Sequence, residues 1–162
     1  MIVMINFFKN KKISQFEKEF VSLGKKLLNW QINKRNMKIV NKKLFKLEAD
    51  LKADLLLKKL IKKYFLNTDI ISEENSINEL SNSFWIIDPI DGTRSFFNNF
   101  DGYVIQASYC FEKKPIYSII YSPVKNKKWT AIINKGAFLN GKKIKKNSLK
   151  RTTRVIDNYP KP

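Results

Sequence analysis

The spacing of apolar residues changes near residue 69, and this change limits the folds that the chain can adopt. Before residue 69, apolar side chains recur about every 3.6 positions, which is the repeat of a helix with one buried face. After it, apolar residues come in short runs of strand length that are separated by turn residues. The sequence therefore predicts helices followed by a sheet, which is the order of an α+β domain.

Two helices are expected before residue 69, over residues 14–32 and 48–66. The first should begin at a capping box, because Ser14 is followed three positions later by Glu17. The basic segment between the helices is expected to form a loop with a short strand at 37–40. The side chains expected to face the core are Phe16, Phe20, Leu23, Leu27 and Ile32 in the first helix and Leu51, Leu55, Leu56, Leu60 and Tyr64 in the second.

The chain after residue 69 is expected to form a mostly antiparallel sheet, on which the two N-terminal helices pack. Asn140-Gly141 favours a two-residue hairpin turn of type I′. The expected strands are 69–72, 84–88, 102–111, 115–123 and 128–134, followed by a hairpin over 137–144 and a last strand at 153–158.

Composition limits the class of protein. The formal net charge is +18, which would suit a protein that binds nucleic acid. The positive residues are mostly lysines spread along the chain, whereas nucleic-acid sites gather arginine and exposed aromatic residues on one face, so we interpret the charge as compositional. The single cysteine, Cys110, lies in an apolar run and suits a reducing, cytoplasmic compartment, and no apolar run is long enough to cross a membrane.

Acidic residues stand where two of the apolar runs end: Glu73, Glu74, Asp88 and Asp91. Adjacent strands would bring these ends together, and the carboxylates would repel one another in a pocket of low dielectric. A divalent cation removes that repulsion, and Mg²⁺ prefers oxygen ligands while keeping exchangeable waters. The pattern therefore predicts a Mg²⁺ site.

The residues that follow Asp88 predict a phosphate site beside the metal. Pro89 keeps Asp88 extended, Gly92 permits a tight turn, and Thr93 can cap a helix that follows. Backbone N–H groups at the start of such a helix attract phosphate. Phosphatases with an aspartyl nucleophile carry their two acids two positions apart, whereas Asp88 and Asp91 are three apart, so we do not expect a covalent aspartyl-phosphate.

The stretch "WIIDPIDGT", preceded by "LEAD" and "ISEEN", resembles the inositol monophosphatase family of metal-dependent phosphatases. The family pattern is an Asp, then Glu-Glu, then D-P-[IL]-D-G-T. These elements match Asp50, Glu73-Glu74 and the segment 88–93. The resemblance covers roughly residues 14–145 and implies the first half of the layered sugar-phosphatase fold.

The resemblance also implies a set of metal ligands. Glu73, Asp88 and the backbone carbonyl of Ile90 would bind one Mg²⁺. Asp88 and Asp91 would bind a second, with Asp88 bridging the two ions. These ions would activate the attacking water and neutralise charge on the phosphoryl oxygens.

The resemblance implies further roles around the phosphate. Gly92 and Thr93 would hold the phosphate through their backbone N–H groups. Thr93 and Asp50 would orient or deprotonate the attacking water, and Glu74 would support the site from behind.

The chain departs from the family pattern in two places. The family's C-terminal W-D-x-A-A-G segment, whose Asp would complete the second metal site, has no counterpart here. Leu47 stands where a Thr is usual in the approach to Asp50. We therefore expect residues 1–13 to be an N-terminal extension and residues 14–162 to be the N-terminal portion of a truncated domain or of a split enzyme.

Such a chain is expected to have impaired activity on its own. It should also expose an apolar sheet face or edge, where the missing C-terminal half or a second copy in a homodimer would dock.

The expected substrate is a small phosphorylated metabolite. Arg94-Ser95-Phe96 after the motif leans toward the histidinol-phosphate branch of the family, although the arginine could also face solvent. Inositol phosphate and 3′-phosphoadenosine 5′-phosphate stay open as substrates. Two other functions also stay open: a non-catalytic module that binds metal and phosphate, and, least favoured, a basic nucleic-acid binder.

Overall fold

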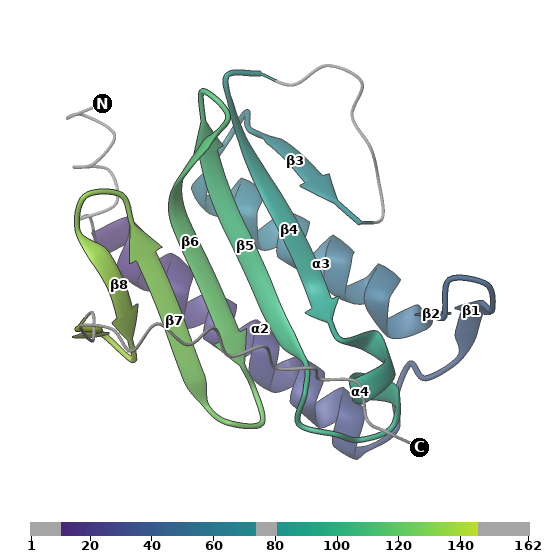
Figure 1. Ribbon diagram of the computed structural model, residues 1–162. Helices are drawn as coiled ribbons and strands as arrows, with labels where there is room; N and C mark the ends of the chain where they lie inside the picture. The colour runs from purple at the N-terminus through teal and green to yellow at the C-terminus, as the bar shows by residue number, and fades with distance from the viewer. Residues whose placement is uncertain (1–10, 74–80, 146–162) are drawn as a thin grey trace, which may run out of the picture.

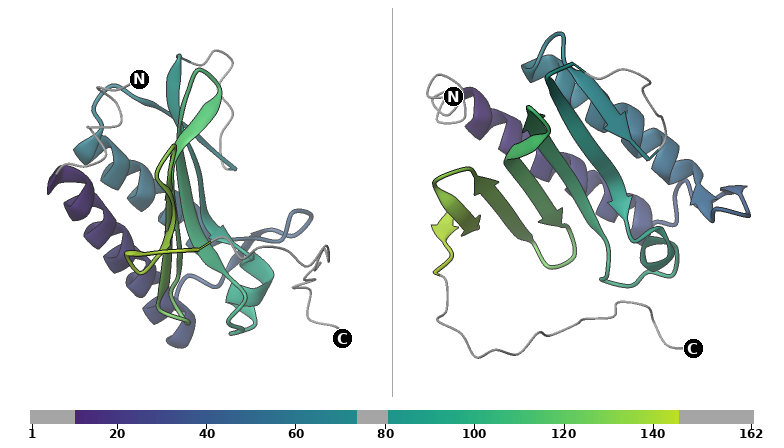
Figure 2. Two further views of the ribbon diagram at one scale, coloured as in Figure 1. Left: turned by 60° about the vertical axis from the view of Figure 1, so that its left-hand side comes forward. Right: turned by 45° about the horizontal axis from the view of Figure 1, so that its top comes forward.

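The computed structural model describes residues 11–73 and 81–145, and within these ranges a pair of long helices packs on one face of a seven-stranded sheet (Figure 1). The helices are α2 (Lys11–Ile32) and α3 (Glu48–Tyr64). Both lie on the same side of the sheet (Figure 2). The expected α+β architecture is confirmed. Among the described helices, none combines the length and apolar character that crossing a membrane requires.

Helix α2 buries most of the expected stripe. Phe16, Phe20 and Leu27 are fully buried. The prediction for Ile32 is wrong, because it is the last residue of the helix and its side chain is 64% exposed. The capping-box prediction is also wrong: the helix already includes Lys11, so Ser14 lies within it and three residues assigned to the N-terminal extension belong to it.

Helix α3 buries part of the expected face, because Leu60 and Tyr64 are buried and Leu56 packs against the core, but the rest of its buried face differs. Leu51 and Leu55 were expected inside, but they are 40% and 59% exposed. Ala49 and Ala53 are fully buried instead, because small side chains allow the helix to approach its neighbours closely. The buried residues of the helix are Ala49, Asp50, Ala53, Asp54, Leu57, Leu60, Ile61 and Tyr64.

A small hairpin connects the two long helices. Its strands are β1 (Ile39–Asn41) and β2 (Lys46–Leu47), which pair in antiparallel fashion. The expected short strand at 37–40 overlaps β1, whereas β2 was not predicted. The hairpin projects outward beyond the start of α3 (Figure 1), and two residues of its tip, Leu44 and Phe45, line the same pocket as the end of β4 and the start of α4.

The sheet has the order β3-β4-β5-β6-β7-β8-β9. The pair β3–β4 is parallel and all later neighbours are antiparallel, so the predicted antiparallel meander is confirmed. The strand expected at 153–158 lies outside the described residues. The strands are β3 (Asp69–Ser72), β4 (Ser83–Asp91), β5 (Val104–Phe111), β6 (Lys114–Ser122), β7 (Lys127–Ile132), β8 (Gly136–Leu139) and β9 (Lys142–Lys143), and a short helix, α4 (Thr93–Phe97), follows β4.

The turn between β8 and β9 confirms the hairpin prediction. Asn140 and Gly141 have φ angles of 49° and 80°, as a type I′ turn requires.

Aromatic packing joins the helices to the sheet. Trp85 of β4 is fully buried, and its ring centroid lies 5.4 Å from that of Phe16 and 4.9 Å from that of Phe65. Helix α2 approaches the sheet closely at Gly24, where an added Cβ would lie 2.4 Å from Cδ1 of Tyr121. The close approach fixes the helix against the sheet and leaves room only for a glycine at that position.

The opposite face of the sheet is covered by neither long helix (Figure 2). Side chains alternate along each strand, and Tyr117 hydrogen-bonds Glu17 of α2, so its sheet neighbours Ser118 and Ile120 point to the other side. Ile86 of this outer face is 46% exposed. Two cross-strand rows lie on it: Ile86, Ser108, Ser118, Ala131 and Ala137, and then Asp88, Gln106, Ile120, Trp129 and Leu139.

Candidate functional site

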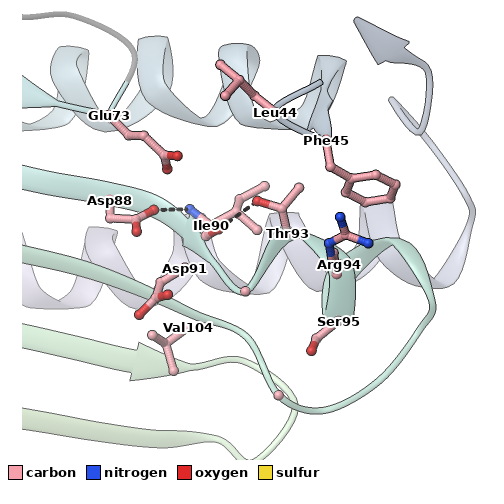
Figure 3. A pocket seen from close by; sticks show the side chains of 12 residues that line it. Leu44, Phe45, Glu73, Asp88, Ile90, Asp91, Thr93, Arg94, Ser95 and Val104 are labelled. Atoms are coloured by element: carbon pink, nitrogen blue, oxygen red, sulfur yellow. Dashed lines mark hydrogen bonds between the residues drawn. The ribbon is translucent and has the colours of Figure 1, made fainter. Parts of the chain in front are cut away.

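A pocket of about 600 Å³ lies where β4 ends and α4 begins (Figure 3). Parallel pairing of β3 with β4 places Ser72 beside Ile87, so the next residues of both strands, Glu73 and Asp88, reach the same edge of the sheet. Both line the pocket, together with Asp91. The structure therefore brings together three of the four clustered acids, and Glu74 lies outside the described residues.

The three carboxyl groups form one end of the pocket, which we call the acid end (Glu73, Asp88 and Asp91). The pKa of Asp88 is raised to about 6, mainly because burial removes the carboxylate from water, and also because Asp91 and Glu73 repel its charge. A hydrogen bond of 3.2 Å from the backbone N–H of Ile90 to Oδ1 of Asp88 opposes this rise only in part. Asp91 is exposed and accepts a hydrogen bond of 2.9 Å from Gln106.

Thr93 connects the acid end to helix α3. Its hydroxyl lies 3.2 Å from Oδ1 of Asp50 and 3.2 Å from the carbonyl oxygen of Ile90, and it can donate its one proton to either. Asp50 is buried, and burial is the main reason why its pKa is raised; repulsion from Glu73 adds to the rise. Thr93 and Asp50, 43 positions apart, thus form a direct pair at the pocket.

Asp50 also closes the first turn of α3. Its Oδ2 accepts a hydrogen bond of 2.6 Å from the backbone N–H of Leu47. Leu47 precedes the helix and has no side-chain oxygen that could cap it, so only one of the two bonds of a capping box is available. This contact explains how Asp50 keeps its orientation although Leu47 occupies the position where a Thr was expected.

Gly92 makes the sharp turn from β4 into α4. Its φ of +100° is strained for any other residue, and an added Cβ would lie 2.7 Å from the carbonyl oxygen of Gly102. The helix predicted to start near Thr93 is confirmed, and its first intrahelical bond runs from the N–H of Phe96 to the carbonyl of Gly92. The N–H groups that come before Phe96 lie at the start of the helix, where they have no intrahelical acceptor.

The acid end fits a hard divalent cation by its chemistry. The donors there are carboxylate oxygens and the Ile90 carbonyl, and oxygen is the ligand that Mg²⁺ prefers. Within residues 11–73 and 81–145, no three acidic, histidine or cysteine side chains are close enough to form a ready-made ion cage. The oxygen donors therefore suit Mg²⁺, but the described side chains alone do not enclose an ion.

The other end of the pocket is aromatic and carries a cation; we call it the hairpin end (Leu44, Phe45 and Arg94). The guanidinium carbon of Arg94 lies 4.7 Å from the centroid of the Phe45 ring. The sequence singled out Arg94 but not Leu44 or Phe45, because no local pattern indicates that the hairpin tip meets α4.

Comparison with known proteins agrees with this geometry. A family model described as the inositol monophosphatase family matches residues 14–158. The chain belongs to the inositol monophosphatase family. As the motif predicts, the D-P-I-D-G-T segment of this family member forms the end of β4 and the turn into α4.

Curated members of the inositol monophosphatase family match only a portion of their own length. Inositol monophosphatase 2 of Solanum lycopersicum is 31% identical over 115 residues, which are 67% of this chain and 43% of that relative. The 3′(2′),5′-bisphosphate nucleotidase CysQ of Haemophilus influenzae is 31% identical over 120 residues, which are 71% of this chain and 43% of that relative. The chain thus spans less than half the length of these two relatives.

A solved structure of the same fold contains a metal and an anion. The crystal structure of an IMPase/NADP phosphatase complexed with Mg²⁺ and phosphate matches with a TM-score of 0.70 and 25% sequence identity, covering 82% of this chain and 52% of that one.

Proposed function

We propose that this chain contributes the metal and phosphate site of a Mg²⁺-dependent phosphomonoesterase that acts on a small phosphorylated metabolite. The observation that carries the proposal is the acid end of the pocket next to the Thr93–Asp50 pair. Membership of the inositol monophosphatase family supports it, as does the related structure that contains Mg²⁺ and phosphate.

The proposed metal ligands come from the C-terminal ends of two neighbouring strands, β3 and β4. Glu73, Asp88 and the carbonyl of Ile90 would hold one cation, and Asp88 and Asp91 would hold a second. A bound divalent cation would lower the pKa of the attacking water and neutralise charge that develops on the phosphoryl oxygens. The raised pKa of Asp88 supports the assignment, because burial first, and then the charges of Asp91 and Glu73, disfavour its ionised form when no counter-charge is present.

The proposed roles of Gly92, Thr93 and Asp50 concern the phosphate and the proton. The backbone N–H groups of Gly92 and Thr93 would bind phosphate oxygens. The Thr93 hydroxyl would accept a hydrogen bond from the attacking water and donate its own proton to Asp50, which would act as the base. A raised pKa suits Asp50 for that role. Glu74, outside the described residues, is proposed to support the site.

We further propose that the outer sheet face is where the counterpart of the relatives' C-terminal half docks and completes this site. The chain spans less than half of the relatives named above, and the outer face leaves Ile86 half-exposed beside Asp88 of the pocket. The occupant would be a segment equivalent to the C-terminal half of those relatives, and a second copy of this chain is the alternative. Without it, weak turnover is expected.

The proposal is tested by titrating the folded chain with MgCl₂ in a calorimeter and by assaying p-nitrophenyl phosphate hydrolysis. Mg²⁺ uptake is expected in the native chain and in Glu112→Gln, which removes an acid from the exposed β5–β6 turn. Asp88→Asn should abolish uptake. Folded native chain that takes up no Mg²⁺ would disprove the proposal. Uptake of Mg²⁺ and phosphate without hydrolysis would favour the second candidate, a non-catalytic binding module.

A further inference from the structure

We infer that the hairpin end of the pocket selects substrates that carry a second anionic group beyond the phosphate, and that Arg94 binds this group. The inference rests on the proposed function, because it assumes that the phosphate lies at the acid end. It adds a substrate class and a residue that determines specificity.

The Arg94 side chain lines the pocket but forms no ion pair with a described carboxylate of the protein. In Figure 3, the three carboxyl groups lie on one side of Thr93, and the Arg94 guanidinium lies against the Phe45 ring on the other. Among the described residues, its side chain makes no hydrogen bond or ion pair that would occupy its donors, although the acid end is nearby. Its N–H groups are therefore available to a bound molecule.

The contact with Phe45 determines what Arg94 can recognise. Stacking uses the face of the guanidinium, and its five N–H donors stay in the plane, where they match a carboxylate or a phosphate with two parallel hydrogen bonds. The Phe45 ring is itself supported by Phe97 of α4, edge-on at 5.4 Å. The aromatic pair thus holds the cation in one orientation at the wall of the pocket.

The backbone of Phe45 is strained. Its φ is +50°, in the left-handed region that bulky residues rarely adopt. Strain of this kind persists only where the surrounding structure enforces it, and it gathers at ligand sites. Here the strained turn places the Phe45 ring against Arg94 of the pocket. Asparagine or glycine would be less strained at this position, so the contact with Arg94 gives phenylalanine a functional reason to be there.

The charges of the pocket complement a substrate with two anionic groups. The acid end would hold the cations that contact the phosphate, and Arg94 is positive at the hairpin end. Leu44, which is 71% exposed, adds an apolar side chain to the same wall. A pocket of about 600 Å³ has room for a small molecule that bridges both ends.

The test uses two matched pairs of probes that differ only by a carboxylate in place of a CH₂OH group: 3-phosphoglycerate against glycerol 3-phosphate, and 6-phosphogluconate against sorbitol 6-phosphate. Their affinities for the full chain are measured by calorimetry in MgCl₂ at physiological ionic strength. We expect the carboxylate to tighten binding about tenfold or more in at least one pair, as a charge-assisted hydrogen bond would.

Three variants separate the inference from general charge attraction. Arg94→Gln should reduce the ratio of affinities to about one, whereas Arg35→Gln, which removes a similar exposed charge outside the pocket, should leave it unchanged. Phe45→Asn tolerates a positive φ and should lower the ratio with little change in the unfolding temperature. A merely structural role for Phe45 would lower the unfolding temperature and leave the ratio intact.

The outcomes that overturn the inference are distinct from those that overturn the proposed function. If all four probes bind with Mg²⁺ but neither pair shows a preference, or if a preference survives Arg94→Gln, the second-anion site is refuted and the metal and phosphate site stands. If none of the probes binds in the presence of Mg²⁺, both are refuted.

Discussion

Replacing Asp88 by asparagine should stabilise the metal-free protein, although it removes a proposed ligand. In the folded chain the pKa of Asp88 is raised from an ordinary value of 3.8 to about 6, first by burial and then by repulsion from Asp91 and Glu73. Between these two pH values the folded state holds the Asp88 proton more tightly than the unfolded state does. Stability therefore falls as the pH rises through this interval, and the full penalty is present above about pH 6.

The size of the effect follows from the pKa values. Each pH unit of difference corresponds to about 1.4 kcal/mol, so the rise from 3.8 to about 6 sets an upper limit of about 3 kcal/mol. Partial exposure of Asp88 to solvent reduces this value, and we expect a gain of about 2 kcal/mol at pH 8. Asparagine keeps an oxygen that can accept the Ile90 N–H, so this hydrogen bond is not lost. The corresponding rise in unfolding temperature is about 4–8 °C.

The assay is urea unfolding in EDTA at pH 8 and pH 4, repeated at pH 8 in MgCl₂. Asp88→Asn should be more stable than the native chain at pH 8 and equal to it at pH 4, while Glu112→Gln should match the native chain throughout. MgCl₂ at a hundredfold excess over Kd should stabilise the native chain by about 2.7 kcal/mol and leave Asp88→Asn unchanged. An unchanged or lower stability of Asp88→Asn in EDTA at pH 8 would refute the electrostatic reasoning.

Three further substitutions test the packing around the site. Gly24→Ala should destabilise the fold by about 1–2 kcal/mol in urea unfolding, because the new methyl group displaces Tyr121 and this outweighs the better helix propensity of alanine; equal stability would refute the close packing. Gly92→Ala should lower the unfolding temperature and abolish calorimetric Mg²⁺ uptake, since the turn cannot keep its φ; normal uptake would contradict this. Asp50→Ala should cost about 1 kcal/mol in urea unfolding through the lost bond to Leu47, whereas Asp50→Asn should keep that bond and its stability; equal losses would contradict the capping role.

The helices and strands were predictable because each carries its own repeat of apolar residues. The faces and ends of the helices were less so, because they depend on tertiary contacts. The sequence pattern selected the large side chains Leu51 and Leu55 for the core of α3, but the close approach of this helix to its neighbours favours Ala49 and Ala53. The two-residue strand β2 is too short to show a repeat, so only pairing with β1 reveals it.

In the candidate site, too, the features that are local in sequence were predictable and those that depend on tertiary contacts were not. Its acid end follows from a strand, a turn and a short helix that are continuous in sequence, and Glu73 could be added because strand ends meet at one edge. The contact of Thr93 with Asp50 was expected only through resemblance to a family. The contact of Phe45 with Arg94 was not expected at all, because nothing local indicates that a hairpin tip folds back over α4.

The charge balance of the pocket is consistent with the proposed binding of a cation and an anion. The protein has 32 lysine and arginine residues, so a basic side chain could have neutralised the acid end. Among the described residues that line the pocket, however, only Arg94 is basic, and its guanidinium lies over the Phe45 ring instead. A lysine beside Asp88 would offset the repulsion from Asp91 and Glu73 but would occupy the space of the proposed metal and phosphate. If the predicted penalty at Asp88 is measured, the unneutralised acid end is what leaves room for the proposed cation.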